Sequence, residues 1–197
     1  IRRIYGFDRP MLVQYGAWLF SALRGDFGES YYFKLPVASL IAERLQVTMT
    51  LGVCGILFAL LTAVPLGVVA AIRPNSLIDR VALFLSVAGQ AMPSFWFGLI
   101  LIVVFAIQLG LLPPSGAATW RHFIMPTIVL GYYAMPAIMR LTRAGMLEVL
   151  RSDYIRTARA KGVSRFSLMF KHALRNAIIP VVSLAAVQFG FMLGGSI

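Results

Sequence analysis

Four long apolar stretches, separated by polar or basic segments, dominate the hydrophobicity pattern of this chain. They cover residues 45–72, 81–109, 123–139 and 177–197. An α-helix rises about 1.5 Å per residue and the hydrocarbon core of a bilayer is about 30 Å thick, so about 20 apolar residues cross it. The pattern therefore predicts four membrane-spanning helices and an all-α integral membrane fold.

Glycines and prolines interrupt these apolar stretches. Residues 81–120 carry no charge but are too long for one span, and the Gly- and Pro-rich segment 110–116 predicts the helix end. Pro93, Pro126 and Pro136 lie inside predicted spans, where a proline removes one backbone hydrogen bond. We therefore expect helix bends at these three prolines.

Residues 1–44 are mixed in character and precede the first apolar stretch. Pro36 could open a short helix over residues 37–44. Apolar side chains recur near helical spacing earlier in this segment, at Leu12, Tyr15, Trp18, Leu19 and Leu23. Two interpretations stay open: an amphipathic helix on the membrane or on its neighbours, and a buried helix of a small extramembrane cap.

The distribution of basic residues predicts the topology. Residues 123–139 number 17, so length alone leaves a re-entrant segment open. Counting them as a span places Arg73–Arg80 and residues 140–176 on one side, and the second segment holds nine Lys or Arg. Cytoplasmic loops are enriched in these residues. We therefore expect a cytoplasmic loop over 140–176, an external segment 1–44 and a transmembrane domain 45–197.

Composition agrees with a membrane protein and excludes several functions. Hydrophobic residues make up 59% and charged residues 13%, against about half and about a quarter in soluble domains. A net charge of +11 suggests nucleic acid in a soluble chain. Here half of the 18 basic residues lie in one loop beside apolar spans, so we expect no nucleic-acid partner.

The residues needed for metal binding or enzymatic catalysis do not occur together. One cysteine, Cys54, and two distant histidines, His122 and His172, form neither a disulfide nor a metal-ligand cluster. The sequence has no Gly-rich loop ending in Gly-Lys-Ser or Gly-Lys-Thr. It also has no Ser/His/Asp set, no Cys/His set and no His-Glu-x-x-His motif. We therefore expect no catalytic residue, metal or cofactor in this chain. Because it does not begin with Met and stops inside an apolar stretch, we expect it to be part of a longer polypeptide.

The basic loop 140–176 has the pattern of a helix, a glycine and a second helix. The small residues Thr157, Ala158 and Ala160 lead into Gly162, which suits a left-handed helix end. Ser164 can cap a helix over 165–175. Asn176 could cap the last span, with Pro180 in its first turn. The apolar face predicted for the first helix consists of Leu147, Leu150, Tyr154 and Ala158.

A short helix with small side chains, projecting into water, suits docking into the groove of another protein. Arginines beside it can pair with acidic groups of that partner. The alternative is a solvated basic loop that sets topology and contacts lipid headgroups. The residue spacing alone leaves both interpretations open.

The loop resembles the EAA loop of ABC transporter permeases, whose pattern is Glu-Ala-Ala, three residues, Gly, nine residues, then Ile-x-Leu-Pro. The matching positions are Ala158, Gly162 and Leu174, and the departing ones are Arg156, Thr157, His172 and Arg175. The departures match the variant found in the dipeptide/oligopeptide/nickel permease branch. Residues 153–162 and 172–180 resemble the corresponding stretches of that branch. Residues 24–30, 93–98, 109–116 and 140–149 also agree with that branch, whereas Gln46 replaces its usual proline.

This resemblance implies the B-type permease subunit of an ATP-driven importer in the bacterial inner membrane, with a type I fold of six spans. It implies a second homologous permease, two ATP-binding subunits and an extracytoplasmic substrate-binding protein as partners, with ATP and Mg held by the ATP-binding subunits. Peptides, glutathione, nickel chelates and some sugars are all solutes of this branch. The residues implied at the ATPase contact are Tyr154, Arg156, Thr157, Ala158, Arg159 and Gly162.

Two other classes of protein stay open. A secondary transporter is expected to carry coupling-ion carboxylates or broken helices at mid-membrane. The four apolar stretches contain no acidic residue, which argues against this class but not against sodium bound by backbone carbonyls. A non-transporting membrane scaffold could use the basic loop to bind lipid or a partner. Copurification with an ATPase, and ATP hydrolysis stimulated by a solute, separate the importer from both.

Overall fold

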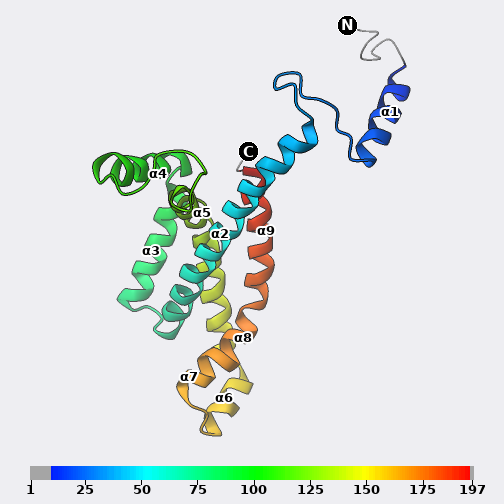
Figure 1. The fold of residues 1–197 in the computed structure, drawn as a ribbon. Coiled ribbons are helices and arrows are strands. Elements are labelled where there is room, and N and C mark those ends of the chain that lie inside the picture. Colours follow the sequence, from blue (N-terminus) through cyan, green and yellow to red (C-terminus); the bar gives the residue numbers. More distant parts are fainter. Residues whose placement is uncertain (1–9, 196–197) are drawn as a thin grey trace. The chain divides into compact units, whose positions relative to one another are not determined.

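The computed structural model describes residues 10–195, so the first nine residues of segment 1–44 and the last two of span 177–197 lie outside the described residues. Within that range the chain is helical and contains no strand, apart from an isolated bridge between Glu29 and Pro36 (Figure 1). The elements are α1 (Met11–Leu23), α2 (Val37–Ile72), α3 (Leu77–Ala91), α4 (Ser94–Leu101), η1 (Ile102–Gln108), α5 (Arg121–Leu150), α6 (Asp153–Ala160), α7 (Arg165–Ser167), η2 (Leu168–Ala173), α8 (Leu174–Ala177) and α9 (Ile179–Gly195).

The chain divides into two compact units, residues 1–47 and residues 48–197. The described part of the first unit holds α1, which has no buried residue, so both interpretations of its apolar spacing stay predictions. Gly25 and Gly28 follow it with φ angles of 80° and 74°, and the Gly28 amide donates to Asp26 Oδ1 at 3.0 Å. Such left-handed turns favour glycine because it lacks a Cβ atom.

Among the described residues, α2 and α5 are each long and apolar enough to cross a membrane. The number of such spans rises to four if each of two bent helix pairs, α3 with α4–η1 and α7–α8 with α9, forms one span. Helix α2 begins at Val37, so the separate short helix expected over 37–44 is wrong. No glycine or proline stands between residues 37 and 47, and helix formers there let the helix begin well before the predicted span.

The predicted span 81–109 is a broken helix pair rather than one bent helix. Helix α3 starts earlier, at Leu77, and Met92 adopts extended backbone with ψ 127° before Pro93. The helices on either side of this break meet at 101° (Figure 1). Proline disfavours helical backbone in the residue before it, which accounts for the extended Met92.

Helix α5 continues without interruption from Arg121 through Pro126 and Pro136 to Leu150. The helix therefore extends past residue 139, where we expect the membrane span to end, and that span boundary stays a prediction. The first basic residues mark a change of polarity, but leucine, arginine, methionine and glutamate in 140–150 all favour continued helix. The bends expected at the two prolines stay predictions.

Helices α2 and α5 cross at glycines. A Cβ atom on Gly131 would lie 2.5 Å from Phe58 Cδ1 and 2.8 Å from the Gly55 carbonyl oxygen. A Cβ atom on Gly67 would lie 2.8 Å from the Met139 carbonyl oxygen. Small residues at such crossings let two backbones approach closely. The buried cluster around the crossing consists of Ala59, Ala63, Ala70, Ala82, Ala134, Ile138, Met139, Val181 and Met192.

We expect Gly131→Leu to destabilise the protein by at least about 2 kcal/mol, because backbone atoms of α2 leave no space for the side chain. The measurement is the melting temperature of the detergent-solubilised full-length protein. Gly190→Leu is the matched control, since no atom lies within 4 Å of a Cβ at that position in α9. Equal melting temperatures for the two variants would contradict the described crossing.

Candidate functional site

The candidate site is built around α6, which follows α5 after a tight turn at Arg151 and Ser152. The Ser152 hydroxyl donates to the Val149 carbonyl oxygen at 2.6 Å, closing the last turn of α5. The apolar face predicted on one continuous helix (Leu147, Leu150, Tyr154 and Ala158) is therefore divided between two helices. A serine that bonds a preceding carbonyl offers the backbone an alternative to further helix.

Ile155 anchors α6 to the rest of the second unit. Its side chain is 1% exposed and belongs to a second buried cluster, here called the loop-base cluster. Its members come from α2, α5, α6, η2 and α8: Val68, Ala71, Met146, Ile155, Leu168, Ala173 and Ala177. Ala158, one turn after Ile155, packs against it. The sequence analysis missed Ile155, although its spacing from Ala158 at i, i+3 is a usable signal.

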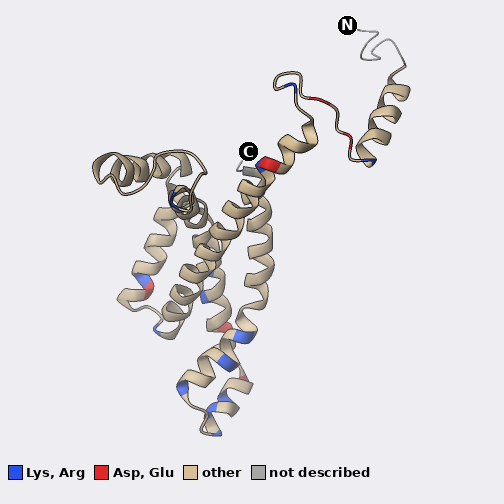
Figure 2. Ribbon diagram, viewed as in Figure 1, with Lys and Arg blue, Asp and Glu red and all other residues tan. Residues whose placement is uncertain are grey.

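The arginines of α6 are exposed to water, and Figure 2 marks the basic positions along this part of the chain. Arg156 has a side chain that is 85% exposed and lies 3.6 Å from the Asp153 carboxylate, a contact weakened by solvent. Arg159 is also exposed. The Thr157 hydroxyl donates to the Asp153 carbonyl oxygen at 2.9 Å, back along its own helix. Two arginines of this short helix are therefore available to a partner.

Gly162 ends α6 in the left-handed conformation, as the sequence predicts, with φ 78°. Its amide donates to the Arg159 carbonyl oxygen at 3.1 Å, and the Val163 amide donates to the Ala158 carbonyl oxygen at 3.2 Å. This pair of bonds is a Schellman helix end, which satisfies two otherwise unpaired carbonyls. The Ser164 hydroxyl then accepts from the Ser167 amide at 3.3 Å, so its predicted capping role is confirmed.

Tyr154 ties α6 to the returning helices. Its hydroxyl donates to the His172 carbonyl oxygen at 3.3 Å and accepts from Asn176 Nδ2 at 2.7 Å. Asn176 lies inside α8 and not before the last span, so its predicted N-cap role is wrong. The helix over 165–175 forms, but its middle is the π-helical η2. Pro180 lies in the first turn of α9, as expected.

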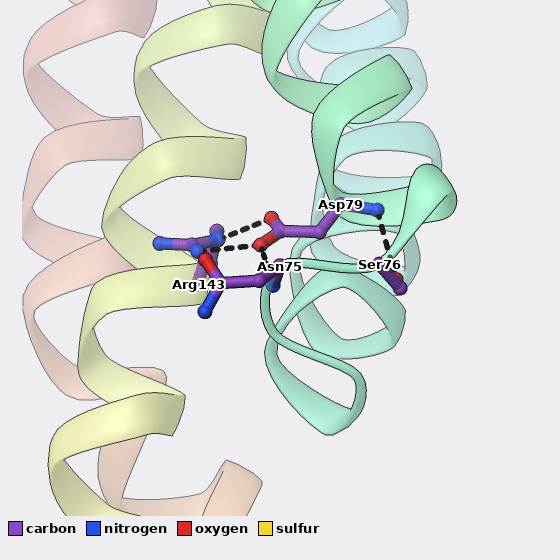
Figure 3. Close-up of polar contacts among 4 residues, drawn as sticks. All are labelled: Asn75, Ser76, Asp79 and Arg143. Atoms are coloured by element: carbon purple, nitrogen blue, oxygen red, sulfur yellow. Dashed lines mark hydrogen bonds and ion pairs between the residues drawn. The ribbon is translucent and has the colours of Figure 1, made fainter.

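An ion pair that the sequence analysis missed joins α3 to α5 (Figure 3). Arg143 Nε donates to Asp79 Oδ1 at 2.6 Å, and Arg143 Nη2 donates to Asp79 Oδ2 at 2.7 Å. Asp79 also sits in the first turn of α3, where Ser76 caps the helix. Both residues were expected on the same side of the membrane, which is the signal that could have suggested their pairing.

Together these features define a class: a multi-span α-helical membrane protein with a folded basic loop anchored beneath its spans. Residues 63–197 match the family described as "Binding-protein-dependent transport system inner membrane component", and the chain belongs to this family. The family has the type I ABC importer permease fold, so the predicted fold class is confirmed.

Curated relatives that match the whole chain are also named transport permeases. It is 42% identical over 197 residues to the glutathione transport system permease protein GsiC of Escherichia coli (strain K12). It is 43% identical over 197 residues to the protein of that name from Pectobacterium atrosepticum. The matches cover 100% of this chain and 64% of each relative. The resemblance to permeases drawn from the loop is confirmed at the level of the family.

Proposed function

We propose that this chain is the permease subunit of an ATP-driven importer. It forms the translocation path together with a second, related permease, and its loop 140–176 contacts ATP-binding subunits. ATP and Mg are held by those subunits, and this chain contributes no catalytic residue. The observation that carries the proposal is the construction of α6: Ile155 is buried against α2 and α5, while Arg156 and Arg159 are exposed to water.

The contact with the ATP-binding subunit uses the exposed face of α6. Arg156 and Arg159 pair with acidic groups of a groove, because guanidinium groups match carboxylates in geometry and charge. Tyr154, Thr157 and Ala158 shape the same short helix, and Gly162 fixes where it ends. These six residues form the proposed ATPase interface.

Transport follows from the attachment of α6 to the spans. When ATP binding closes the partner subunits, the docked helix moves with them. Because Ile155 shares the loop-base cluster with Met146 of α5 and Val68 of α2, this movement tilts those helices as bodies. Bends at Pro93, Pro126 and Pro136 set how far the spans separate when the path opens.

The proposed orientation places loop 140–176 in the cytoplasm and residues 1–44 outside, in a bacterial inner membrane. The described residues support it through their charge, since Lys and Arg concentrate around α6 to α8 (Figure 2). An extracytoplasmic binding protein then delivers the solute to the opposite side. Because the named relatives are glutathione transport permeases, we propose glutathione or a similar small peptide as the solute.

The test is reconstitution of the full-length protein with its permease, ATPase and binding-protein partners in liposomes. We expect ATP hydrolysis to rise when the binding protein carries glutathione or a short peptide, and labelled solute to accumulate inside. A matched complex whose ATP-binding subunits lack their catalytic residue serves as the control. Uptake driven by an ion gradient without ATP would instead favour the secondary transporter, and no uptake at all the scaffold.

A further inference from the structure

The start of α3 is held against α5 by a partly buried, bidentate ion pair (Figure 3). Asp79 is 1% exposed and receives two hydrogen bonds from Arg143, at 2.6 and 2.7 Å. The Asn75 amide donates a third, at 2.9 Å, to Asp79 Oδ2. The carboxylate thus binds the α2–α3 turn and α5 at once. Such planar two-bond pairing fixes orientation as well as distance.

A second polar contact joins the same two helices farther along. Arg140 Nη1 donates to the Ser86 hydroxyl at 3.1 Å, and that hydroxyl donates to the Pro136 carbonyl oxygen at 3.2 Å. Ser86 is buried and lies about two helical turns beyond Asp79. Two attachment points along one helix pair restrict rotation as well as separation. Separating Asp79 from Arg143 would leave the buried carboxylate without its counter-charge, so the ion pair favours an arrangement in which α3 and α5 stay packed together.

The ion pair is connected to the proposed ATPase contact through α5. Arg143 precedes Met146 by one turn of α5, and Met146 packs with Ile155 of α6 in the loop-base cluster. Resting on the proposed function, we propose that Asp79 and Arg143 are positioning residues for coupling. They stay paired throughout the cycle and carry the displacement of α6 into α3, and so to the break at Met92 where α4 turns away.

The first test compares Asp79→Asn and Arg143→Gln in the reconstituted full transporter, with Arg80→Gln as the matched control. Arg80 is exposed and adjoins Asp79 on α3. The readout is solute molecules transported per ATP hydrolysed, which a merely reduced amount of protein does not change. We expect this ratio to fall about tenfold in the two pair variants and to stay unchanged in the control, a loss of ordinary coupling size. An unchanged ratio in Asp79→Asn overturns the proposal.

A second variant keeps the test decisive if the single changes reduce assembly. Cys54 is the only cysteine of residues 1–197. Cys54→Ser, with serine also replacing any cysteine elsewhere in the full transporter, gives a background for Asp79→Cys/Arg143→Cys. A short bifunctional thiosulfonate then replaces the ion pair by a covalent link, reversible with dithiothreitol. We expect linking to raise the transport ratio above that of the same reduced protein.

If linking instead blocks transport, α3 and α5 must separate during the cycle and the positioning role is wrong. The unaltered protein, measured in the same liposomes, keeps the two proposals distinct. If the unaltered protein does not couple uptake to ATP hydrolysis, the proposed importer function is wrong. If the unaltered protein couples normally and the covalent link inhibits transport, only the positioning role of Asp79 and Arg143 is wrong.

Discussion

Gly162→Pro is expected to abolish the stimulation of ATP hydrolysis by solute-loaded binding protein while the chain still inserts into the membrane. Gly162 has φ 78°, and proline is restricted to about −65°. Proline also removes the amide that donates to the Arg159 carbonyl oxygen at 3.1 Å. The last turn of α6 then unwinds or turns in another direction, and the helix no longer fits the groove.

The measurement is binding-protein-stimulated ATP hydrolysis by the reconstituted complex, with membrane insertion followed by fractionation. Gly162→Ala is expected to give a partial loss, since an L-residue in the left-handed region costs about 1–2 kcal/mol. Gly110→Ala is the matched control because Gly110 has φ 61° but lies between η1 and α5, away from α6. If the binding protein still stimulates ATP hydrolysis in Gly162→Pro, α6 does not have the proposed docking role.

Ile155→Asp is expected to have a comparably large effect through a different cause. The side chain is 1% exposed, so the substitution places a carboxylate in an apolar cluster without a partner. Its burial costs several kcal/mol, and we expect α6 to leave the loop-base cluster so that the charge reaches water. The exposed arginines remain, but movement of the docked helix no longer tilts α5.

Limited trypsin digestion provides a readout of Ile155→Asp that does not depend on transport. Arg156 and Arg159 follow Ile155 within α6, so a detached α6 is expected to be cut by trypsin faster than α6 of the unaltered protein. Ile155→Val, which keeps an apolar side chain of similar size, is expected to cost about 0.5–1.5 kcal/mol and to retain the original digestion rate. Equal digestion of all three proteins would show that Ile155 does not hold the helix.

Local chemistry made part of this site predictable from sequence. The left-handed end at Gly162 and the cap at Ser164 depend on residues a few positions apart, so spacing was enough to place them. The Asp79–Arg143 pair joins residues 64 positions apart and requires the packing of α3 on α5. No local signal fixes such a partner, and several other basic residues of the loop were equally available.

Helix boundaries were harder to predict because polarity and helicity change at different positions. The basic residues after 139 mark where α5 leaves the apolar region, but good helix formers carry it on to Leu150. Prolines likewise act differently with context. The helix breaks at Pro93, whereas Pro126 lies inside an uninterrupted helix. The tertiary surroundings, rather than the residue type, decide between these outcomes.

Site-specific photocrosslinking can show whether α6 docks on an ATP-binding subunit in the cytoplasm. Benzoylphenylalanine replaces Arg159 on the exposed face of α6 in the full transporter, and Ser183 in α9 serves as the control site. We predict a covalent adduct with the ATP-binding subunit from position 159 and none from position 183. An adduct from position 159 with the binding protein alone, or no adduct with an ATP-binding subunit in a complex active in transport, would show that α6 does not dock on that subunit.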